Sequence, residues 1–472
     1  MFGARNIHYE MAEKTRAIDC GGIGGFHMLV ERTGLIEAID ERLHLLKRHL
    51  PYHESDHVLN IAYNTLTGGT CLDDIELRRN DETYMDTLGA QRIPDPTTAG
   101  DFTRRFSEPD VEALMDAINS VRPKIWNKGL KKSERKEAII DMDGTLAPTT
   151  GDCKEGMGLS YNGVWSYHPL LISLANTAEP LYLLNRSGNR PSHEGAAEWV
   201  DRAVEVASES FRRVCLRGDT DFSLTEHFDR WTEAGVGFAF GMDAMANLVN
   251  IAKGLPSKRW RGLKRRERMS KTIQKRRRPD NVKEHIVVQK GYRNLKLQKE
   301  HVAEFDYTPG KCTRSYRMIV LRKSISVEEG QIRLWDEVRY FFYITNIEDK
   351  TPAEVVFFCN ERCNQENLIE QLKNGLNALR MPVGDLVSNW AYMVMASLAW
   401  TLKAWFALLT DKDGRRDVLL RMEFRRFLNA IVRIPTQVIR GGRRILMRIL
   451  GYNEWTETFL DTWSAIRRLK LA

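Results

Sequence analysis

Cysteine is scarce and scattered in this sequence of 472 residues. The 7 cysteines are odd in number, and none form a Cys-x-x-Cys pair. A disulfide framework and a cysteine-based zinc site are therefore not expected, and a reducing compartment is the simpler interpretation. The N-terminal segment also lacks the apolar stretch of a secretory signal. These absences favour a cytoplasmic protein.

Long apolar runs are equally rare. One segment, residues 390–409, is apolar over about the length that crosses a bilayer. It contains Lys403, and the sequence has no second run of this kind. We interpret it as a buried core helix, with a membrane helix as the alternative, and expect no membrane partner.

The overall composition excludes several classes of protein. Hydrophobic residues make up 42% of the chain and charged residues 28%, as in soluble globular proteins and unlike collagen-like or disordered chains. The length suggests about three folding units. With 71 Lys and Arg against 63 Asp and Glu, the net charge is +8, which favours polyanionic partners such as nucleic acid.

Changes in periodicity and composition divide the chain into five parts. Residues 1–130 read as helical, and we weigh a DNA-binding module against a helical packing domain without a ligand. The others are an α/β layer over 136–250, a basic and then β-rich stretch over 251–340, a helical stretch over 341–410 and a basic helical tail over 411–472.

The α/β layer has a distinctive order of elements. Three short apolar strands follow one another with turns between them, which predicts antiparallel pairing. A helix, a strand, a second helix and a fifth strand come next. This order predicts a mixed α/β sheet.

Two acids end the first of these strands. Asp141 and Asp143 are two residues apart, so their side chains share one face of the strand. Close carboxylates need a cation, and Mg²⁺ is the natural oxygen-bound partner; capping of a turn is the alternative. The Asp-x-Asp-Gly-Thr motif resembles haloacid-dehalogenase-type phosphatases, in which Asp141 would be the nucleophile. Those enzymes place a helical crossover after this strand, whereas two further strands are expected here.

Further acids follow at two later positions. Asp219 ends the fourth strand, where the ribonuclease-H-like fold, which this plan resembles, supplies its second acid; an ordinary loop carboxylate is the alternative. Arg362, Glu366 and Lys373 lie at i, i+4 and i+11, on one helical face. An exposed, salt-bridged helix would show the same spacing.

Together these motifs resemble the Y-R-E-K signature of bacterial insertion-sequence transposases of the DDE type, with Cys359 at the tyrosine position. The resemblance implies a ribonuclease-H-like mixed sheet with helices on both faces, interrupted by a β-rich insertion, between helical N- and C-terminal regions. It implies a metal-binding triad of Asp143, Asp219 and Glu366, with Asp141 in reserve for the first position. Arg362 and Lys373 would hold DNA phosphates.

The same resemblance implies the activity. Such an enzyme cleaves and joins double-stranded DNA at the terminal inverted repeats of its own element, by two-metal hydrolysis and strand transfer. Mg²⁺, or Mn²⁺ in its place, would be the cofactor, with no organic cofactor. A homodimer on paired ends, a hairpin intermediate and a place at the bacterial nucleoid are also implied. The alternatives are the phosphatase and a non-catalytic DNA-binding remnant.

Arginine and lysine gather in two further segments. Residues 253–283 form either a phosphate-tracking arm or a solvated linker. The tail from Arg415 has the same two interpretations, with an amphipathic helix on a membrane surface as a third. From the first segment we predict four DNA contacts: Arg265, Arg266, Arg276 and Arg277.

Overall fold

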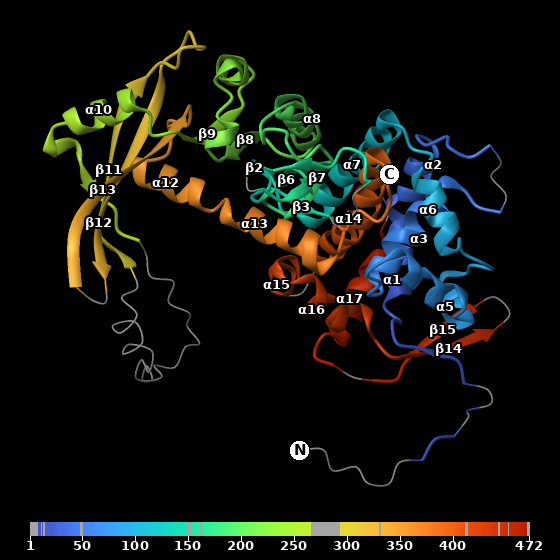
Figure 1. The fold of residues 1–472 in the computed structure, drawn as a ribbon. Helices are drawn as coiled ribbons and strands as arrows, with labels where there is room; N and C mark the ends of the chain where they lie inside the picture. Colours follow the sequence, from blue (N-terminus) through green and yellow to red (C-terminus); the bar gives the residue numbers. More distant parts are fainter. Residues whose placement is uncertain are drawn as a thin grey trace.

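The computed structural model describes residues 8–10, 12, 15–47, 51–149, 153–160, 163–265, 293–329, 332–410, 414–441, 444–451 and 453–469. Three of the predicted DNA contacts, Arg266, Arg276 and Arg277, lie outside these residues. The largest element is a nine-stranded mixed sheet with helices packed around it (Figure 1).

The centre of this sheet confirms the predicted α/β layer. Strands β2, β6 and β7 pair antiparallel in succession, while β8 lies parallel on the other side of β2, followed by parallel β9. Every residue of β6 and β7 is buried, which explains their nearly continuous apolar sequences. The bounds are β2 Glu137–Gly144, β6 Leu170–Leu174, β7 Glu179–Leu184, β8 Arg213–Gly218 and β9 Gly237–Met242.

Helices lie on both sides of these strands. Helix α8 contacts β2, β6, β7 and β8, whereas α12 contacts β9 and the strands beyond it. In Figure 1, α8 lies above the central strands and α12 and α13 run below them. The bounds are α8 Ala196–Ser208, α9 Phe228–Glu233, α10 Ala246–Gly254, α12 Pro352–Asn360 and α13 Cys363–Glu370.

The β-rich insertion extends the central sheet and does not form a separate one. Its long strands follow the order β10-β11-β12-β13, and β13 pairs antiparallel with β9. Strand β13 also runs across the position near residue 340 where the sequence suggested the insertion ends. The bounds are β10 Arg261–Gly262, β11 Arg293–Tyr307, β12 Tyr316–Glu329 and β13 Ile332–Thr345.

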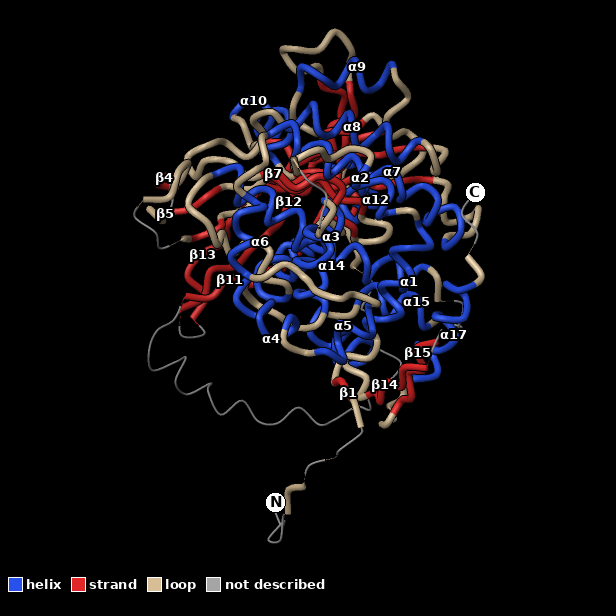
Figure 2. Tube along the Cα trace, turned by 90° about the vertical axis from the view of Figure 1, so that its right-hand side faces the viewer, coloured by secondary structure: helices blue, strands red, loops and turns tan. Residues whose placement is uncertain are grey.

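The long apolar segment forms helix α14, Leu386–Leu408, in the interior (Figure 2). Among the described residues it is the one helix long and apolar enough to cross a membrane, and its apolar window is entirely buried within the protein. It packs against the N-terminal helices α3 and α7, so its apolar sequence serves the core. The N-terminal bounds are α1 Ile23–Thr33, α2 Leu35–Asp40, α3 Glu54–Leu66, α4 Ile75–Arg79, α5 Glu82–Leu88, α6 Pro96–Thr103 and α7 Glu108–Gly129.

The prediction of a helical tail was wrong over residues 436–441 and 444–449, which form the antiparallel pair β14–β15. Gly441-Gly442 separates two runs rich in β-branched and apolar residues, which is a hairpin signal that the surrounding helical periodicity obscured. Strand β1 joins β14, so the tail packs on the N-terminal part. The bounds are β1 Ala17–Ile18, α15 Arg415–Arg421, α16 Phe424–Phe427, β14 Thr436–Gly441, β15 Arg444–Ile449 and α17 Thr456–Arg467.

The segment of the chain that connects β2 to β6 forms a small three-stranded sheet, with the order β3-β5-β4. Among the described residues between these two strands there is no helical crossover after the Asp-x-Asp-Gly-Thr motif, contrary to what the phosphatase alternative requires. The bounds are β3 Ala147–Pro148, β4 Gly158–Leu159 and β5 Trp165–Tyr167.

Candidate active site

The ends of two neighbouring parallel strands bring Asp143 and Asp219 together. The register pairs Asp141 of β2 with Arg217 of β8, so two residues further on Asp143 and Asp219 come to the same level of the sheet edge. Asp219 also caps the short helical turn after β8, where its Oδ1 accepts a hydrogen bond from the Asp221 backbone N–H at 3.1 Å. Both carboxylates therefore sit on rigid backbone.

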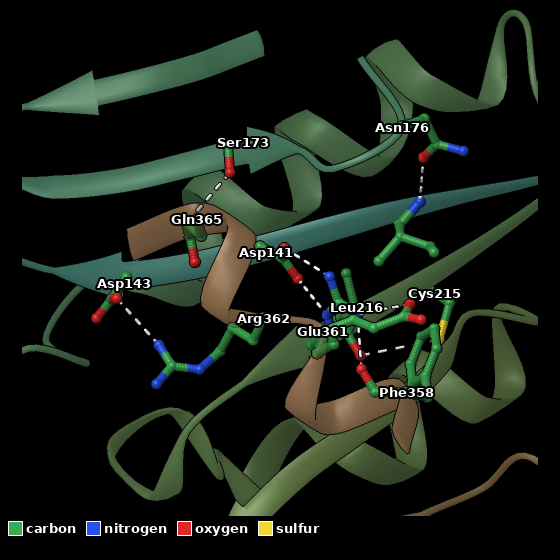
Figure 3. A network of polar contacts seen from close by, with 12 residues as sticks. Asp141, Asp143, Ser173, Asn176, Cys215, Leu216, Phe358, Glu361, Arg362 and Gln365 are labelled. Carbon is green, nitrogen blue, oxygen red and sulfur yellow. Dashed lines mark hydrogen bonds and ion pairs between the residues drawn. The ribbon is translucent and has the colours of Figure 1, made fainter. Parts of the chain in front are cut away.

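Glu366 and Arg362 come from α13 and the residue before it. Helix α12 is started by Thr351 and Glu354, whose side chains form a capping box, and α13 follows directly. Two side-chain hydrogen bonds from Gln365 Nε2 hold α13 on β6. One goes to Ser173 Oγ at 3.1 Å (Figure 3) and the other to the Leu171 carbonyl at 3.3 Å.

The three predicted acids meet at one guanidinium group. Arg362 Nη1 donates to Asp143 Oδ2 at 3.0 Å, and Nη2 lies 3.6 Å from Asp219 Oδ2 and 4.0 Å from Glu366 Oε1. The ion pair with Asp143 is visible in Figure 3. Three carboxylates therefore share a single positive charge.

The environment of Asp143 and Asp219 changes their titration, and burial is the main cause. Burial raises the pKa of the Asp143 carboxyl to about 6; Arg362 opposes the shift, and the nearby Asp219 charge adds to it. Burial also raises the pKa of Asp219, again against the influence of Arg362. The cluster therefore has room for further positive charge.

Asp141 has a different environment, although it lies only two residues away. Its two oxygens accept from Arg217 Nε at 2.6 Å and Nη2 at 2.8 Å, while Arg217 Nη1 donates to the Phe358 carbonyl at 2.7 Å. The Asp141 and Arg217 side chains are 1% and 2% exposed. The structure therefore uses Asp141 in a closed ion pair, out of reach as the nucleophile of a phosphatase.

Comparisons with known proteins decide the family. A family model described as "Transposase DDE domain group 1" matches residues 19–471. The chain belongs to this family of DDE transposases. No significant match was found among curated protein sequences. A solved structure, the piggyBac transposase synaptic complex with hairpin DNA, is similar over 95% of this chain and 85% of its own, at 9% identity and a TM-score of 0.40.

Lys373 of this transposase lies in a π-helical turn, Gln371–Gly375, that continues α13. Such turns are rare in proteins overall, and those that occur are often found at functional sites. Burial lowers the pKa of Lys373, and the charges of Glu370 and Asp143 act in the opposite direction. The turn is tied to the C-terminal part by Gln371 Oε1, which accepts from the Phe424 backbone N–H at 2.8 Å.

Arg265 is not brought to the carboxylate cluster. Its guanidinium makes two hydrogen bonds to Glu300 on β11, at 2.6 and 2.8 Å. This pair neutralises the charge that the sequence assigned to DNA. Arg265 therefore has an intramolecular role in the described part of the transposase.

Residues from distant segments pack beside the cluster, and the sequence predicted a structural role for one of them, His168, without placing it there. Gly144 follows Asp143, and a Cβ there would lie 2.8 Å from His168 Nε2 and 3.0 Å from Ser192 Oγ. His168 is fixed in turn by Nδ1, which lies 2.7 Å from the Arg190 carbonyl. Gly144 in the motif was the one local indication that other atoms approach the backbone closely here. The atoms that do so belong to His168 and Ser192, which are distant in the sequence.

Arg362 lies among the carboxylate oxygens that a metal ion would need. Within the residues that the structure describes, no three His, Cys, Asp or Glu side chains are grouped closely enough to hold a metal ion as they stand. The donors at the cluster are carboxylate oxygens only, which suits Mg²⁺ or Mn²⁺.

Proposed function

We propose that this transposase cleaves and joins DNA at the terminal inverted repeats of its own insertion sequence. Asp143, Asp219 and Glu366 would hold divalent metal ions. The observation that supports this is the convergence of the three carboxylates, from β2, β8 and α13, on one guanidinium. The strand order β7-β6-β2-β8-β9 supports a ribonuclease-H-like catalytic core.

Each residue would have a distinct task in this reaction. Bound Mg²⁺, or Mn²⁺, supplies activation of the attacking oxygen and charge stabilisation for the leaving oxygen. Asp143 and Asp219 keep their ligand atoms fixed because both end central strands. Arg362 would exchange its contacts with the carboxylates for contacts with a DNA phosphate, and Lys373 would bind a second phosphate.

The remaining expectations of the sequence belong to the same proposal. The enzyme would act on element ends and target DNA as a homodimer, at the bacterial nucleoid, without an organic cofactor. Asp141, which the sequence kept as a reserve ligand, would support the strand through Arg217. A hairpin on the excised end would form if the Y-R-E-K resemblance extends to the order of strand cleavage.

The test is DNA cleavage by active-site variants. Duplexes that carry the inverted repeats flanking the coding region would be incubated with Mg²⁺ and the parent protein. We expect Asp143→Asn, Asp219→Asn and Glu366→Gln each to lower the cleavage rate by more than about a hundred-fold. Mutation of a group that only orients a metal ligand typically lowers activity by about 10- to 100-fold, and loss of the ligand itself should lower it at least as much. Binding to the same duplex should persist.

Asp221→Asn is the matched control, because Asp221 is an exposed acid two residues from Asp219. It should cleave like the parent. A parent that binds the ends but never cuts them would support the non-catalytic remnant instead. Turnover of a phosphomonoester that depends on Asp141 but not on Glu366 would support the phosphatase.

A further inference from the structure

The hairpin β14–β15 is rich in arginine and carries no acid. Residues 436–449 contain 4 arginines and neither aspartate nor glutamate. Of these arginines, Arg440, Arg444 and Arg448 lie in the described strands, and all three are exposed. In Figures 1 and 2 the hairpin projects at one margin of the molecule, beside α5 and α17.

The register of the hairpin separates two faces. Val438 pairs with Met447 and Thr436 with Ile449, and this inward face lines an apolar groove with α1, the end of α5 and α17. The other face points away from these helices except at Leu446, which also lines the groove. It consists of Gln437, Ile439, Arg444, Leu446 and Arg448, which we call the outward face.

The hairpin is held in one orientation. Arg440 Nη1 and Arg16 Nη1 both bind Asp86 of α5, at 2.8 and 2.9 Å. The Val438 backbone N–H also donates to the Arg16 carbonyl at 2.8 Å. The outward face is therefore presented by a rigid ribbon and needs no ordering before it binds.

The chemistry of the outward face suits duplex DNA. Arg448 donates to Gln437 Oε1 across the strands at 3.2 Å, and Arg444 has no acidic partner among the described residues. The two arginines are four residues apart on one strand, or about 13 Å. A major groove about 12 Å wide admits a two-stranded ribbon, and arginine and glutamine bind phosphates and base edges.

We infer that β14–β15 inserts its outward face into the major groove of duplex DNA, as a contact separate from the catalytic carboxylates. The inference rests on the proposed function for its substrate, DNA. In Figure 1 the hairpin and the α13 helix lie in different parts of the molecule. The contact would therefore fall on DNA away from the bond that is cut, which adds affinity without touching the reaction.

The test measures DNA binding without metal, in an Asp219→Asn background that prevents cleavage. The probe is a mixed-sequence duplex several helical turns long, titrated by fluorescence anisotropy at several salt concentrations. The double variant Arg444→Ala, Arg448→Ala should lower the slope of log affinity against log salt by about 1.8, and low-salt affinity by about ten-fold. The double variant to lysine should restore most of the slope.

Matched controls keep the result specific. Arg230 and Arg314 are exposed arginines paired with Asp201 and Glu233, and their double alanine variant removes the same charge elsewhere. It should bind DNA like the parent. An unchanged slope in the hairpin variant, with native thermal unfolding, would overturn the inference.

Two further outcomes remain distinguishable. Loss of binding to vesicles of anionic phospholipid, with DNA binding intact, would assign the outward face to a membrane surface and reject DNA. If the catalytic proposal fails, the parent will not cut DNA in the presence of Mg²⁺. The binding experiment contains no metal and does not measure cutting, so the two proposals fail separately.

Discussion

Charged side chains lie side by side at two successive positions along β2 and β8, which we call the inner and the outer level. The inner level pairs opposite charges, whereas the outer level brings like charges together. At the inner level Asp141 faces Arg217, one carboxylate for one guanidinium, with both groups buried and hydrogen-bonded. At the outer level Asp143 lies near Asp219, and Glu366 joins them around Arg362. Opposite charges across strands stabilise a sheet and like charges destabilise it. The inner level therefore stabilises the fold, whereas the like charges at the outer level destabilise it.

A second buried acid follows the inner pattern. Glu179 of β7 is fully buried, and its oxygens accept from Arg122, Trp126, Trp405 and Thr177. These donors come from α7, α14 and the turn before β7, so the carboxylate joins the N-terminal helices to the sheet. Asp141 and Glu179 are thus each matched by buried donors, whereas the three carboxylates around Arg362 share one guanidinium.

The largest expected effect concerns the inner level. Asp141→Asn should lower the free energy of unfolding by about 3–5 kcal/mol, because buried Arg217 would keep only the exposed Glu361 carboxylate, 3.9 Å away, as a counter-charge. Asp143→Asn should cause no such loss. Urea denaturation of the metal-free proteins at neutral pH measures both.

Changing both partners sharpens this result. Asp141→Leu combined with Arg217→Met should recover much of the lost stability, because neither buried charge remains. Equal destabilisation by Asp141→Asn and Asp143→Asn would remove the distinction between the levels.

A somewhat smaller effect should appear in the pH dependence of the outer level. The pKa of Asp143 is about 6, above its usual 3.8, so the folded protein binds more protons than the unfolded chain between these values. Stability of the metal-free protein should therefore fall as pH rises from about 4 to about 6, by up to about 3 kcal/mol. Thermal unfolding in the presence of a chelator should show this slope.

Asp143→Asn tests the assignment of that slope to one group. The variant cannot titrate at this position, so its stability should change much less with pH over the same window. A slope that persists unchanged in the variant would place the titrating group elsewhere.

Much of this arrangement could be predicted from the sequence. The acids at the ends of β2 and β8 and the helical spacing of Arg362 and Glu366 are local patterns, and they identified residues that the structure brings together. The choice between Asp141 and Asp143 could not be made, because it depends on which of them meets Arg217 across the strands. That partner is 76 positions away in the chain.

Other features also required tertiary information. The hairpin in the tail forms where Arg16 and α5 provide its inner surface, although the surrounding sequence repeats arginine at helical intervals. Arg265 was assigned to DNA from its basic neighbours, whereas its counter-charge, Glu300, lies on a strand beyond residues 266–292. In the hairpin the distant partners outweigh the local pattern, whereas the DNA contact of Arg265 stays a prediction.

The smallest expected effect concerns the one cation at the outer level. Arg362 contacts all three carboxylates, so a divalent ion must compete with it for the same oxygens. Arg362→Gln should therefore bind Mn²⁺ about three- to ten-fold more tightly in the absence of DNA, as expected for the loss of a partly buried ion pair of about 1 kcal/mol. Isothermal titration calorimetry of the free protein measures this without reference to activity. Arg79→Gln removes an equal charge from an exposed pair with Glu76 and should leave Mn²⁺ affinity as in the parent. Weaker Mn²⁺ binding by Arg362→Gln would mean that the arginine organises the carboxylates for the metal and does not compete with it.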